Sequence, residues 1–450
     1  MKKILHSIKL IEESCIGCTD CIKRCPTEAI RVRNGKAKIN DEVCIDCGMC
    51  VRVCRSHAKK TVTDSLEMIK GFKFTVALPA PSLYAQFKKI RDVNLILTAV
   101  KKIGFDDVFE VSKAAEFVTA ATRKIISEGN LKKPVISSAC PAVIKLITMR
   151  FPSLIDNILP VISPMELAAI FVKKYLVKNK GLKYSDIGVF FISPCAAKRT
   201  NTINPLGIQK SAVDGVIGIS DVYMAILDKA TKIKQEDVEI LTSSTSRGIN
   251  WALIGGESST LGVDNAISVD GMENVIEILE NLENGQIHDV EFIEALACIG
   301  GCVGGPLTLE NSFFAKNILK KTQRYTAMSE ADRFRKFDFD IDESDYKFCK
   351  PIEEVNFLEL DDDLSVALKK LQMMNDIYQK LPMIDCGSCG APTCRALAED
   401  VVRGSANIED CIFMLRQQVK NLAKSMVELT SKMPQTIKGE EHNANSFEGE

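Results

Sequence analysis

The sequence has only four histidines in 450 residues, too few for extensive zinc–imidazole chemistry. It has no run of about 18 apolar residues, so we expect no segment that spans a membrane. The start of the chain carries two lysines but no apolar core of signal-peptide length, and we therefore expect a cytoplasmic protein. The formal net charge is −1 and the basic residues are scattered, which gives no electrostatic reason to expect a nucleic-acid partner.

Cysteine, in contrast, is abundant, with seventeen in the chain. Disulfides are unexpected in a reducing compartment, and a chain of this length, about three domains, can bury a core without them. Sixteen of the cysteines fall into four groups of four, and Cys349 is left over as a structural thiol. The composition therefore predicts that thiolates bind metal clusters.

The segment 1–62 repeats one cysteine pattern. The spacing Cys-x2-Cys-x2-Cys-x3-Cys begins at Cys15 and recurs at Cys44, with an Asn34-Gly35 hairpin signal between the two copies. This is the bacterial ferredoxin spacing, in which the fourth cysteine of each copy binds the other cluster. The predicted ligands of the two 4Fe–4S clusters are Cys15, Cys18, Cys21 and Cys54, and Cys44, Cys47, Cys50 and Cys25. A structural zinc site is the alternative, and the doubled spacing argues against it.

From residue 72 the pattern of apolar residues along the chain changes. Apolar, β-prone runs alternate with helical stretches; the runs are residues 74–78, 134–136 and 187–192, and the helical stretches include 221–229 and 273–282. Near-continuous apolar strands are typical of parallel sheets that helices cover on both faces. The sequence therefore predicts an α/β fold for this central block.

Four cysteines of the central block are far apart in sequence. Cys140, Cys195 and Cys298 each follow a predicted strand, and we expect them at one edge of a sheet, where α/β folds place their sites. A glycine-rich turn connects Cys298 to Cys302, and it should let the backbone approach a bulky inorganic ligand closely. Each thiol taken singly has a structural alternative, since isolated buried cysteines are common.

The motifs around these cysteines resemble those of the catalytic domain of iron-only (di-iron) hydrogenases. They are Ser137-Ser138-Ala139-Cys140-Pro141, Ser193-Pro194-Cys195-Ala196-Ala197-Lys198, and a third from Glu294 to Gly305. The resemblance implies an H-cluster between two lobes, in which the four thiolates hold a 4Fe–4S cluster and Cys302 bridges to a di-iron site with CO, CN and azadithiolate ligands. It also implies that Lys198 donates a hydrogen bond to a cyanide ligand.

Several positions depart from the pattern of the catalytic members. The cysteine that passes protons in those members is Ala139 here, and a glutamate of their proton path is Asn201. Two methionines that pack on the di-iron site are replaced by Ser193 and Leu296. Positioned proton transfer is worth ~10²–10⁴ in rate, so we expect slow turnover. Glu257 is a carboxylate that offers another proton route, although a solvated loop charge is the simpler interpretation.

This pattern resembles the sensory hydrogenases, and it favours a slow H2 sensor that exchanges electrons with a redox or signalling partner. Two other functions stay open. One is an ordinary H2-evolving or H2-consuming hydrogenase, against which Ala139 and Asn201 argue. The other is a non-catalytic iron–sulfur assembly protein without a di-iron site, in which Lys198 would have little purpose. The sequence is compatible with a homodimer.

The last four cysteines resemble those of a small 4Fe–4S domain found in electron-transfer and corrinoid iron–sulfur proteins. They are Cys386, Cys389, Cys394 and Cys411, and a zinc site is the alternative. The amphipathic stretch 412–433 predicts a helix that either docks a partner or packs back onto its domain. We expect a ferredoxin-like domain at 1–62, a hydrogenase domain at 70–345, a C-terminal 4Fe–4S domain at 366–433 and a disordered tail at 434–450. Three 4Fe–4S clusters and an H-cluster are thus predicted.

Overall fold

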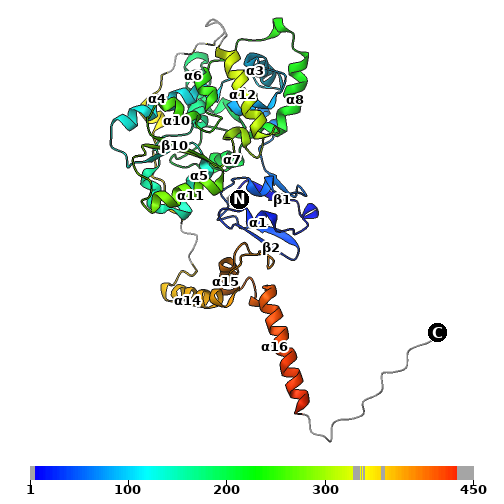
Figure 1. Cartoon of the computed structure of the whole chain (residues 1–450). Coiled ribbons are helices and arrows are strands. Elements are labelled where there is room, and N and C mark those ends of the chain that lie inside the picture. Colours follow the sequence, from blue (N-terminus) through cyan, green and yellow to red (C-terminus); the bar gives the residue numbers. More distant parts are fainter. Residues whose placement is uncertain (1–5, 328–334, 336, 338–339, 356–359, 433–450) are drawn as a thin grey trace, which may run out of the picture. The chain divides into compact units, whose positions relative to one another are not determined.

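The structure is a computed structural model, and it describes residues 6–327, 335, 337, 340–355 and 360–432. The chain forms two compact units, Met1–Phe357 and Leu358–Glu450, which we call the first and the second unit (Figure 1). The predicted tail at 434–450 lies outside the described residues. Among the described helices, none has both the length and the apolar character needed to cross a bilayer.

The N-terminal segment, described from residue 6 to residue 62, forms a small α+β part of the first unit. Its elements are β1 (Ile8–Leu10), η1 (Glu12–Ser14), α1 (Asp20–Lys23), β2 (Ile30–Arg33), β3 (Lys36–Ile39), α2 (Met49–Arg52) and β4 (Lys59–Thr61). β1 pairs antiparallel with β4, and β2 pairs antiparallel with β3. Asn34 and Gly35 connect β2 to β3 with φ of 52° and 71°, which suits a type I′ turn. The predicted hairpin is therefore confirmed.

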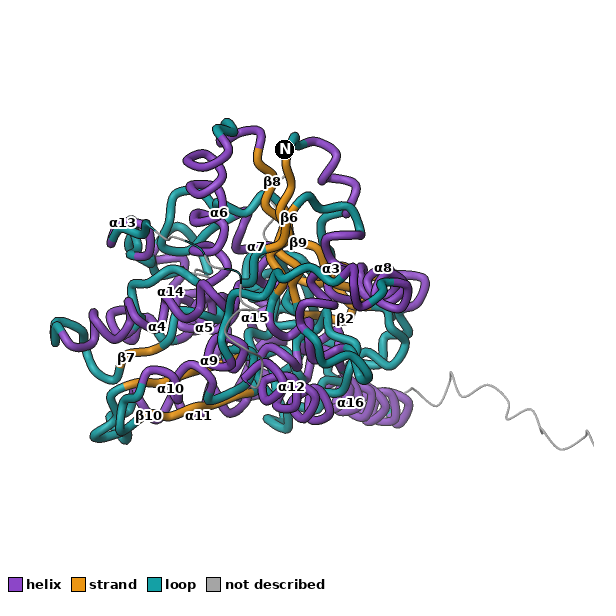
Figure 2. The backbone as a smooth tube through the Cα atoms, turned by 90° about the horizontal axis from the view of Figure 1, so that it is seen from above, coloured by secondary structure: helices purple, strands orange, loops and turns teal. Residues whose placement is uncertain are grey.

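A four-stranded parallel sheet forms one half of the central block. Its strands, in the order β6-β5-β8-β9, are Asp107–Val108, Phe74–Pro79, Ile187–Ser193 and Gly215–Gly218. The helices that cover it include α3 (Val93–Lys102), α4 (Val111–Ser127), α6 (Pro164–Lys180), α8 (Ile219–Lys232) and α12 (Ser312–Ala327). In β8, Val189 and Phe191 pack with α4 and α6, whereas Phe190 and Ile192 pack with α3 and α8. Figure 2 shows these two helix pairs on opposite sides of β8 and β9.

A second parallel sheet, of three strands, lies beside the first in the same unit. Its order is β10-β11-β7, with bounds Ala266–Asp270, Phe292–Leu296 and Val135–Ile136. Ile136 and Ile293 pack against α5 (Pro141–Arg150) and α11 (Met272–Glu283), and Val135 and Phe292 belong to the core around α4. The predicted α/β class with helix-covered parallel sheets is confirmed.

The remaining elements of the first unit are short. The helices are α7 (Ala196–Ile203), α9 (Ser246–Asn250), α10 (Gly256–Leu261) and α13 (Glu343–Tyr346). The 3₁₀ helices are η2 (Leu66–Gly71), η3 (Pro81–Gln86), η4 (Pro152–Asn157), η5 (Tyr184–Asp186), η6 (Gln235–Asp237) and η7 (Cys302–Gly304). The N-terminal segment is not separate from the central block, since Ala29, Val43 and Ile45 pack in the same apolar cluster as α5 and α11.

The described part of the second unit is helical. It contains α14 (Leu364–Lys380), α15 (Cys394–Val402), η9 (Ile408–Asp410) and α16 (Ile412–Ser431). Its small core lies between α14 and α15, where Met374, Leu381 and Leu397 are buried. The predicted C-terminal helix is present, although its expected last residue, Met433, lies outside the described residues.

Candidate metal centre

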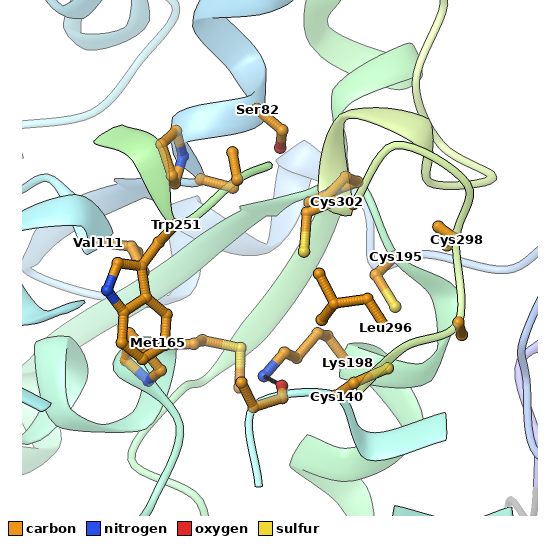
Figure 3. Close-up of a pocket in the computed structure, with 18 of the residues that line it drawn as sticks. Ser82, Val111, Cys140, Met165, Cys195, Lys198, Trp251, Leu296, Cys298 and Cys302 are labelled. Carbon is orange, nitrogen blue, oxygen red and sulfur yellow. Dashed lines mark hydrogen bonds between the residues drawn. The ribbon is translucent and has the colours of Figure 1, made fainter. Parts of the chain in front are cut away.

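The four dispersed cysteines line one cavity in the first unit (Figure 3). Cys140 directly precedes α5, Cys195 directly precedes α7, Cys298 follows β11 and Cys302 begins η7. The cavity has a volume of about 110 Å³, whereas one water needs roughly 10–15 Å³. The fold thus brings together four thiols from distant parts of the sequence. They surround a cavity several times larger than the space that one water molecule needs.

The cavity lies between the carboxyl ends of two sheets, not at one edge of a single sheet. β8, which leads to Cys195, belongs to the four-stranded sheet, whereas β7 and β11, which lead to Cys140 and Cys298, belong to the three-stranded sheet. The expectation of one shared sheet edge was therefore wrong. Strand-to-cysteine spacing cannot reveal which strands are neighbours, because sheet membership depends on long-range pairing.

The thiols are too far apart to hold one zinc ion. In a tetrahedral site with Zn–S bonds of about 2.3 Å, the sulfurs lie about 3.8 Å apart. Among the described residues, a single group of three or more Cys, His, Asp or Glu side chains has its ligand atoms within 4.8 Å of one another, namely His6, Cys44 and Asp46. No three thiols of any quartet meet that limit in the described part of the chain.

Burial makes these thiols poor acids in the absence of a cation. It raises the pKa of Cys195 to about 11 and that of Cys302 to about 12, and neighbouring cysteines add to both shifts. Burial also raises the pKa of Cys298 well above its usual range. Since metal ligation needs thiolates, the positive charge that would stabilise four of them here is that of bound iron. The donor set fits an iron–sulfur cluster.

Lys198 lines the cavity from α7, on the side of Cys140 and Leu296 (Figure 3). Its Nζ donates a hydrogen bond to the carbonyl oxygen of Ala139 at 3.1 Å. An ammonium group has three protons, so two remain for acceptors in the cavity. Lys198 therefore offers a cation and directed donors beside the four thiols.

Ser82 is a site residue that the sequence reasoning missed. It lies in η3, and its side chain points toward the cavity (Figure 3). Its Oγ is fully buried and has no hydrogen-bond partner among the described residues. A buried hydroxyl without a partner costs free energy, so this atom suits a polar ligand in the cavity. A lone serine after an apolar strand gives no signal in the sequence.

Three of the substituted positions have different surroundings. Leu296 is buried and lines the cavity opposite Met165 and Trp251 (Figure 3). Ser193 is buried but does not border the cavity; its Oγ accepts from the backbone N–H of Cys195 at 3.0 Å and donates to the Cys195 carbonyl at 2.9 Å. Asn201 lines a different, smaller cavity, where its Oδ1 accepts from the backbone N–H of Leu206. The hydrogen bonds of Ser193 therefore fix the turn that carries Cys195, whereas Asn201 lies away from the main cavity.

Glu257 is not the solvated loop charge that the sequence suggested. It lies in α10, only 3% exposed, and lines the cavity together with Glu294. The Oγ of Ser137 donates to Glu257 Oε2 at 2.5 Å, and the same Oγ accepts from the backbone N–H of Ala139 at 3.2 Å. Burial, and then the charge of Glu294, raise the pKa of Glu257 to about 8. Burial and the neighbouring carboxylate therefore favour the protonated form of this carboxyl on the cavity wall.

Glu294, the second carboxyl on the cavity wall, leads to the protein surface through two serines. Burial raises its pKa, although backbone and side-chain donors oppose the shift. Its Oε2 accepts from Ser258 Oγ at 2.8 Å, and Ser258 Oγ lies 2.6 Å from the Oγ of Ser268. Ser268 is exposed on β10. A chain of exchangeable groups thus runs from the cavity to solvent.

The glycine-rich turn serves the protein's own backbone. A Cβ on Gly301 would lie 2.6 Å from the backbone nitrogen of Ile254, and Gly301 has φ of +91°. A Cβ on Gly305 would lie 2.1 Å from the carbonyl oxygen of Pro194. Packing of the protein's own backbone is therefore one reason for glycine at these positions, and the close approach to an inorganic ligand stays a prediction. These glycines let the loops that carry Cys195, Cys298 and Cys302 pack together.

The N-terminal cysteines are arranged as two related halves. The backbone N–H of Ala29 donates to Cys25 Sγ at 3.2 Å, and that of Ala58 donates to Cys54 Sγ at the same distance. Such donors favour thiolate ligands. The second predicted quartet shares one small cavity, whose lining includes Cys25, Cys44, Cys47 and Cys50. This shared cavity agrees with the crossed assignment of Cys25.

The second of these quartets borders the dispersed one. Cys47 lines the main cavity as well as its own. Arg52, the last residue of α2, donates from Nη2 to the carbonyl oxygen of Gly305 at 2.7 Å, and its charge lowers the pKa of Cys298 against the larger effect of burial. The two cysteine groups therefore belong to one continuous region of the first unit.

The second unit brings its own four cysteines together. Cys386, Cys389, Cys394 and Cys411 line one small cavity. The carboxylate of Asp385 accepts from the backbone N–H of Cys394 at 2.6 Å, which fixes the start of α15. This quartet is contained within the second unit.

Comparisons with known proteins agree with these sites. The sequence matches the family described as a 4Fe-4S dicluster domain over residues 7–55, and that described as a putative Fe-S cluster over 381–413. It is 25% identical over 347 residues to the NADP-reducing hydrogenase subunit HndD of Solidesulfovibrio fructosivorans, covering 66% of this chain and 56% of that protein. The chain thus spans little more than half the length of this curated relative.

Two further proteins match a smaller part of the chain or match it at lower sequence identity. The cytosolic Fe-S cluster assembly factor nar1 of Aspergillus flavus is 27% identical over 166 residues, 36% of this chain and 28% of that protein. A solved FeFe-hydrogenase of Chlamydomonas reinhardtii aligns with a TM-score of 0.43 and 18% identity, over 58% of this chain and 85% of that chain.

A third family match covers the central block that carries the cavity. Residues 73–262 and 257–306 match the family described as iron only hydrogenase large subunit, C-terminal domain. These ranges together make up just over half of the 450 residues. They contain all four dispersed cysteines, Lys198 and the two glutamates of the cavity wall, Glu257 and Glu294. The chain is therefore a member of the iron-only hydrogenase large-subunit family, with iron–sulfur domains at both ends of the matched region.

Proposed function

We propose that the protein is a low-turnover iron-only hydrogenase that senses H2. The observation that carries this proposal is the composition of the cavity wall. Four thiols and Lys198 meet there, whereas position 139, which the catalytic members fill with a proton-carrying cysteine, is an alanine. The site is thus equipped to hold a metal group but lacks the side chain associated with fast turnover.

The residues present fit an H-cluster. Cys140, Cys195, Cys298 and Cys302 would hold its 4Fe–4S part, with Cys302 as the bridge to the di-iron site. When bound, this group supplies the reversible conversion of H2 into protons and electrons. Lys198 Nζ and the unpartnered Ser82 Oγ supply hydrogen-bond donors suited to small anionic ligands such as cyanide. The largely apolar remainder of the wall excludes water from these contacts.

The handling of protons distinguishes a slow enzyme from an inactive one. Ala139 cannot carry a proton, but Glu257 is protonated at neutral pH because its pKa is raised to about 8. It can release a proton toward the cavity and regain one through Glu294, Ser258 and Ser268. This route contains no cavity thiol and passes through buried carboxyls before it reaches the exposed Ser268, which supports slow turnover rather than none.

The handling of electrons follows from the neighbouring quartets. Cys47 lies on the wall of the main cavity, so a 4Fe–4S cluster on Cys25, Cys44, Cys47 and Cys50 would be adjacent to the site of chemistry. A cluster on Cys15, Cys18, Cys21 and Cys54 would extend this path, and a third 4Fe–4S cluster in the second unit would report the redox state to a redox or signalling protein.

Infrared spectroscopy on the matured protein tests the proposal. We expect CO and CN stretching bands that change when H2 is added, together with a low rate of H2 evolution. Ala139→Cys should raise that rate by more than tenfold, because it restores a proton carrier. Rates in the parent protein as high as those of dedicated hydrogenases would contradict the sensor function, and an unchanged rate in the variant would show that Ala139 does not limit turnover.

The same spectra decide between the alternatives. A matured protein without CO and CN bands, but with full iron–sulfur content, would favour an assembly role like that named for the nar1 relative. Bands accompanied by fast turnover would favour an ordinary hydrogenase. The cavity space beyond the four thiols, with Lys198 and Ser82 on its wall, argues for the di-iron site.

A further inference from the structure

Helix α16 of the second unit has an apolar face that its own unit leaves uncovered. None of its residues is buried, and every residue from Leu415 to Ser431 is exposed. Only its start is anchored, where Met414 packs on the small core and Gln418 donates to Glu409 of η9 at 2.7 Å. Most of the stability of a helix in a protein comes from tertiary packing of its apolar face, so this helix needs a covering surface.

The exposed apolar residues follow a heptad repeat. Alternating steps of three and four residues separate six of them, which are Ile412, Leu415, Val419, Leu422, Met426 and Leu429. They are 47–67% exposed. The repeat extends over three heptads, which is the shortest length that indicates a coiled coil, although the charges that usually flank such a seam are absent within α16 except for Arg416. A helix that packs on a globular core usually has a wider apolar face than this two-position stripe.

The residues at the two apolar positions indicate the kind of coiled coil. The first position of each heptad holds Ile412, Val419 and Met426, and the fourth holds leucine in all three heptads. Within parallel coiled coils, β-branched residues at the first position with leucine at the fourth favour two strands over three or four, and two of the three first positions here are β-branched. The seam is therefore suited to a second copy of itself.

The charges agree with this arrangement. In a parallel pair, the positions that flank the seam would bring Gln418 beside Ala423 and Ser425 beside Thr430, so no like charges meet. Lys420 and Lys424 occupy positions that point away from the seam. Arg416 is the only charged residue at a flanking position within α16, and it lies five residues after Cys411, a proposed thiolate ligand. A cation near an anionic cluster at the joined ends is favourable.

We propose that α16 joins two copies of this chain through a parallel, two-stranded coiled coil. Cys411 immediately precedes α16 and lines the cavity of the C-terminal quartet. A parallel pair therefore places both C-terminal quartets at the same end of the coiled coil. An antiparallel pair would separate them by the length of the helix, about 30 Å at 1.5 Å per residue. This proposal does not depend on the chemistry at the central cavity.

The mass of the full chain in solution tests the proposal. Sedimentation of the anaerobic, cluster-loaded protein should give twice the mass of one chain. Leu422→Lys, at the centre of the seam, should halve that mass. Val427→Lys is the matched control, because Val427 is 70% exposed on the same helix but lies outside the seam, and it should leave the mass unchanged. Equal iron content in both variants shows that the second unit still folds.

A single-chain mass for the parent protein, or equal behaviour of the two variants, overturns the proposal. A photo-crosslinker at position 429 then tests the orientation. In a parallel pair, the tryptic peptide of residues 425–432 should link to a second copy of itself. Linkage to the peptide that ends at Arg416 would mean an antiparallel pair, and linkage to residues 1–357 would mean that α16 docks on the first unit instead; both contradict the proposal.

Discussion

Replacing Glu257 with glutamine should remove a strong pH dependence of stability. The pKa of Glu257 is raised from its ordinary value near 4.5 to about 8 by burial and by Glu294. Between these two values the folded protein keeps a proton that the unfolded chain releases, so folding becomes less favourable as pH rises. Each pH unit in this window costs about 1.36 kcal/mol, or roughly 3 kcal/mol between pH 5.5 and pH 8.

Glu257→Gln should therefore have little effect at pH 5.5 and should stabilise the first unit at pH 8. Glutamine preserves the shape and accepts the hydrogen bond from Ser137, but it has no proton to lose. The assay is thermal unfolding of both proteins across pH 5.5 to 8.5, with tryptophan fluorescence as the signal, because the single Trp251 lies in the same cavity wall. The midpoint of the variant should exceed that of the parent by an increasing margin, reaching several degrees at pH 8.

The control is Glu236→Gln, an exposed glutamate on η6 whose side chain is 76% exposed. Its midpoint should follow that of the parent at every pH. Parallel curves for Glu257→Gln and the parent would refute the inference that Glu257 is protonated near neutral pH, and with it the proposed route for protons. A variant that was less stable at pH 8 would refute it as well.

Three further changes test the proposed cluster sites. Lys198→Ala should weaken the CO and CN infrared bands of the matured protein, because the cavity loses its cation; bands of full intensity would show that Lys198 is dispensable. Arg52→Ala should make the reduction potential of the dispersed cluster more negative by tens of millivolts, where about 59 mV corresponds to a tenfold change in a one-electron equilibrium. Potentiometric titration with electron paramagnetic resonance measures this, and Arg55→Ala, whose side chain is 89% exposed, should leave the potential unchanged. Cys411→Ser should remove about one cluster's iron while the H2-dependent infrared changes persist, and loss of those changes would mean that the quartets are not independent.

The local structure was largely predictable from the sequence. The apolar runs at 74–78 and 187–192 are the strands β5 and β8. Successive residues of a strand point to opposite faces of the sheet, and both faces are buried here, so the whole run is apolar. Asn34-Gly35 specified a hairpin because both positions need positive φ. The family match agrees with the cysteine motifs that indicated the iron-only hydrogenases. Signals of this kind depend on neighbouring residues, which a sequence displays directly.

Features that depend on long-range packing could not be predicted. Glu257 follows two glycines and looked like a loop charge, but tertiary packing buries it against Ser137, 120 residues away. Ser82 became a candidate only because the cavity surrounds its hydroxyl. The division of the strands between two sheets is also set by pairings such as that of β11 with β7. Sequence patterns thus say little about which polar groups of a site are buried.

The N-terminal segment is joined to the central block by buried polar contacts as well as by packing. Asp46 accepts from Thr200 Oγ1 at 2.6 Å, Ser7 Oγ lies 2.7 Å from the same Thr200 Oγ1, and Arg52 donates to the carbonyl oxygen of Gly305 in the loop of Cys302. A separate ferredoxin would have to find its partner by diffusion, at a rate that depends on concentration and ionic strength. In this chain the two proposed cluster sites are held together in one unit, so electron transfer between them would need no such encounter. That step should proceed equally well in dilute protein and at high salt.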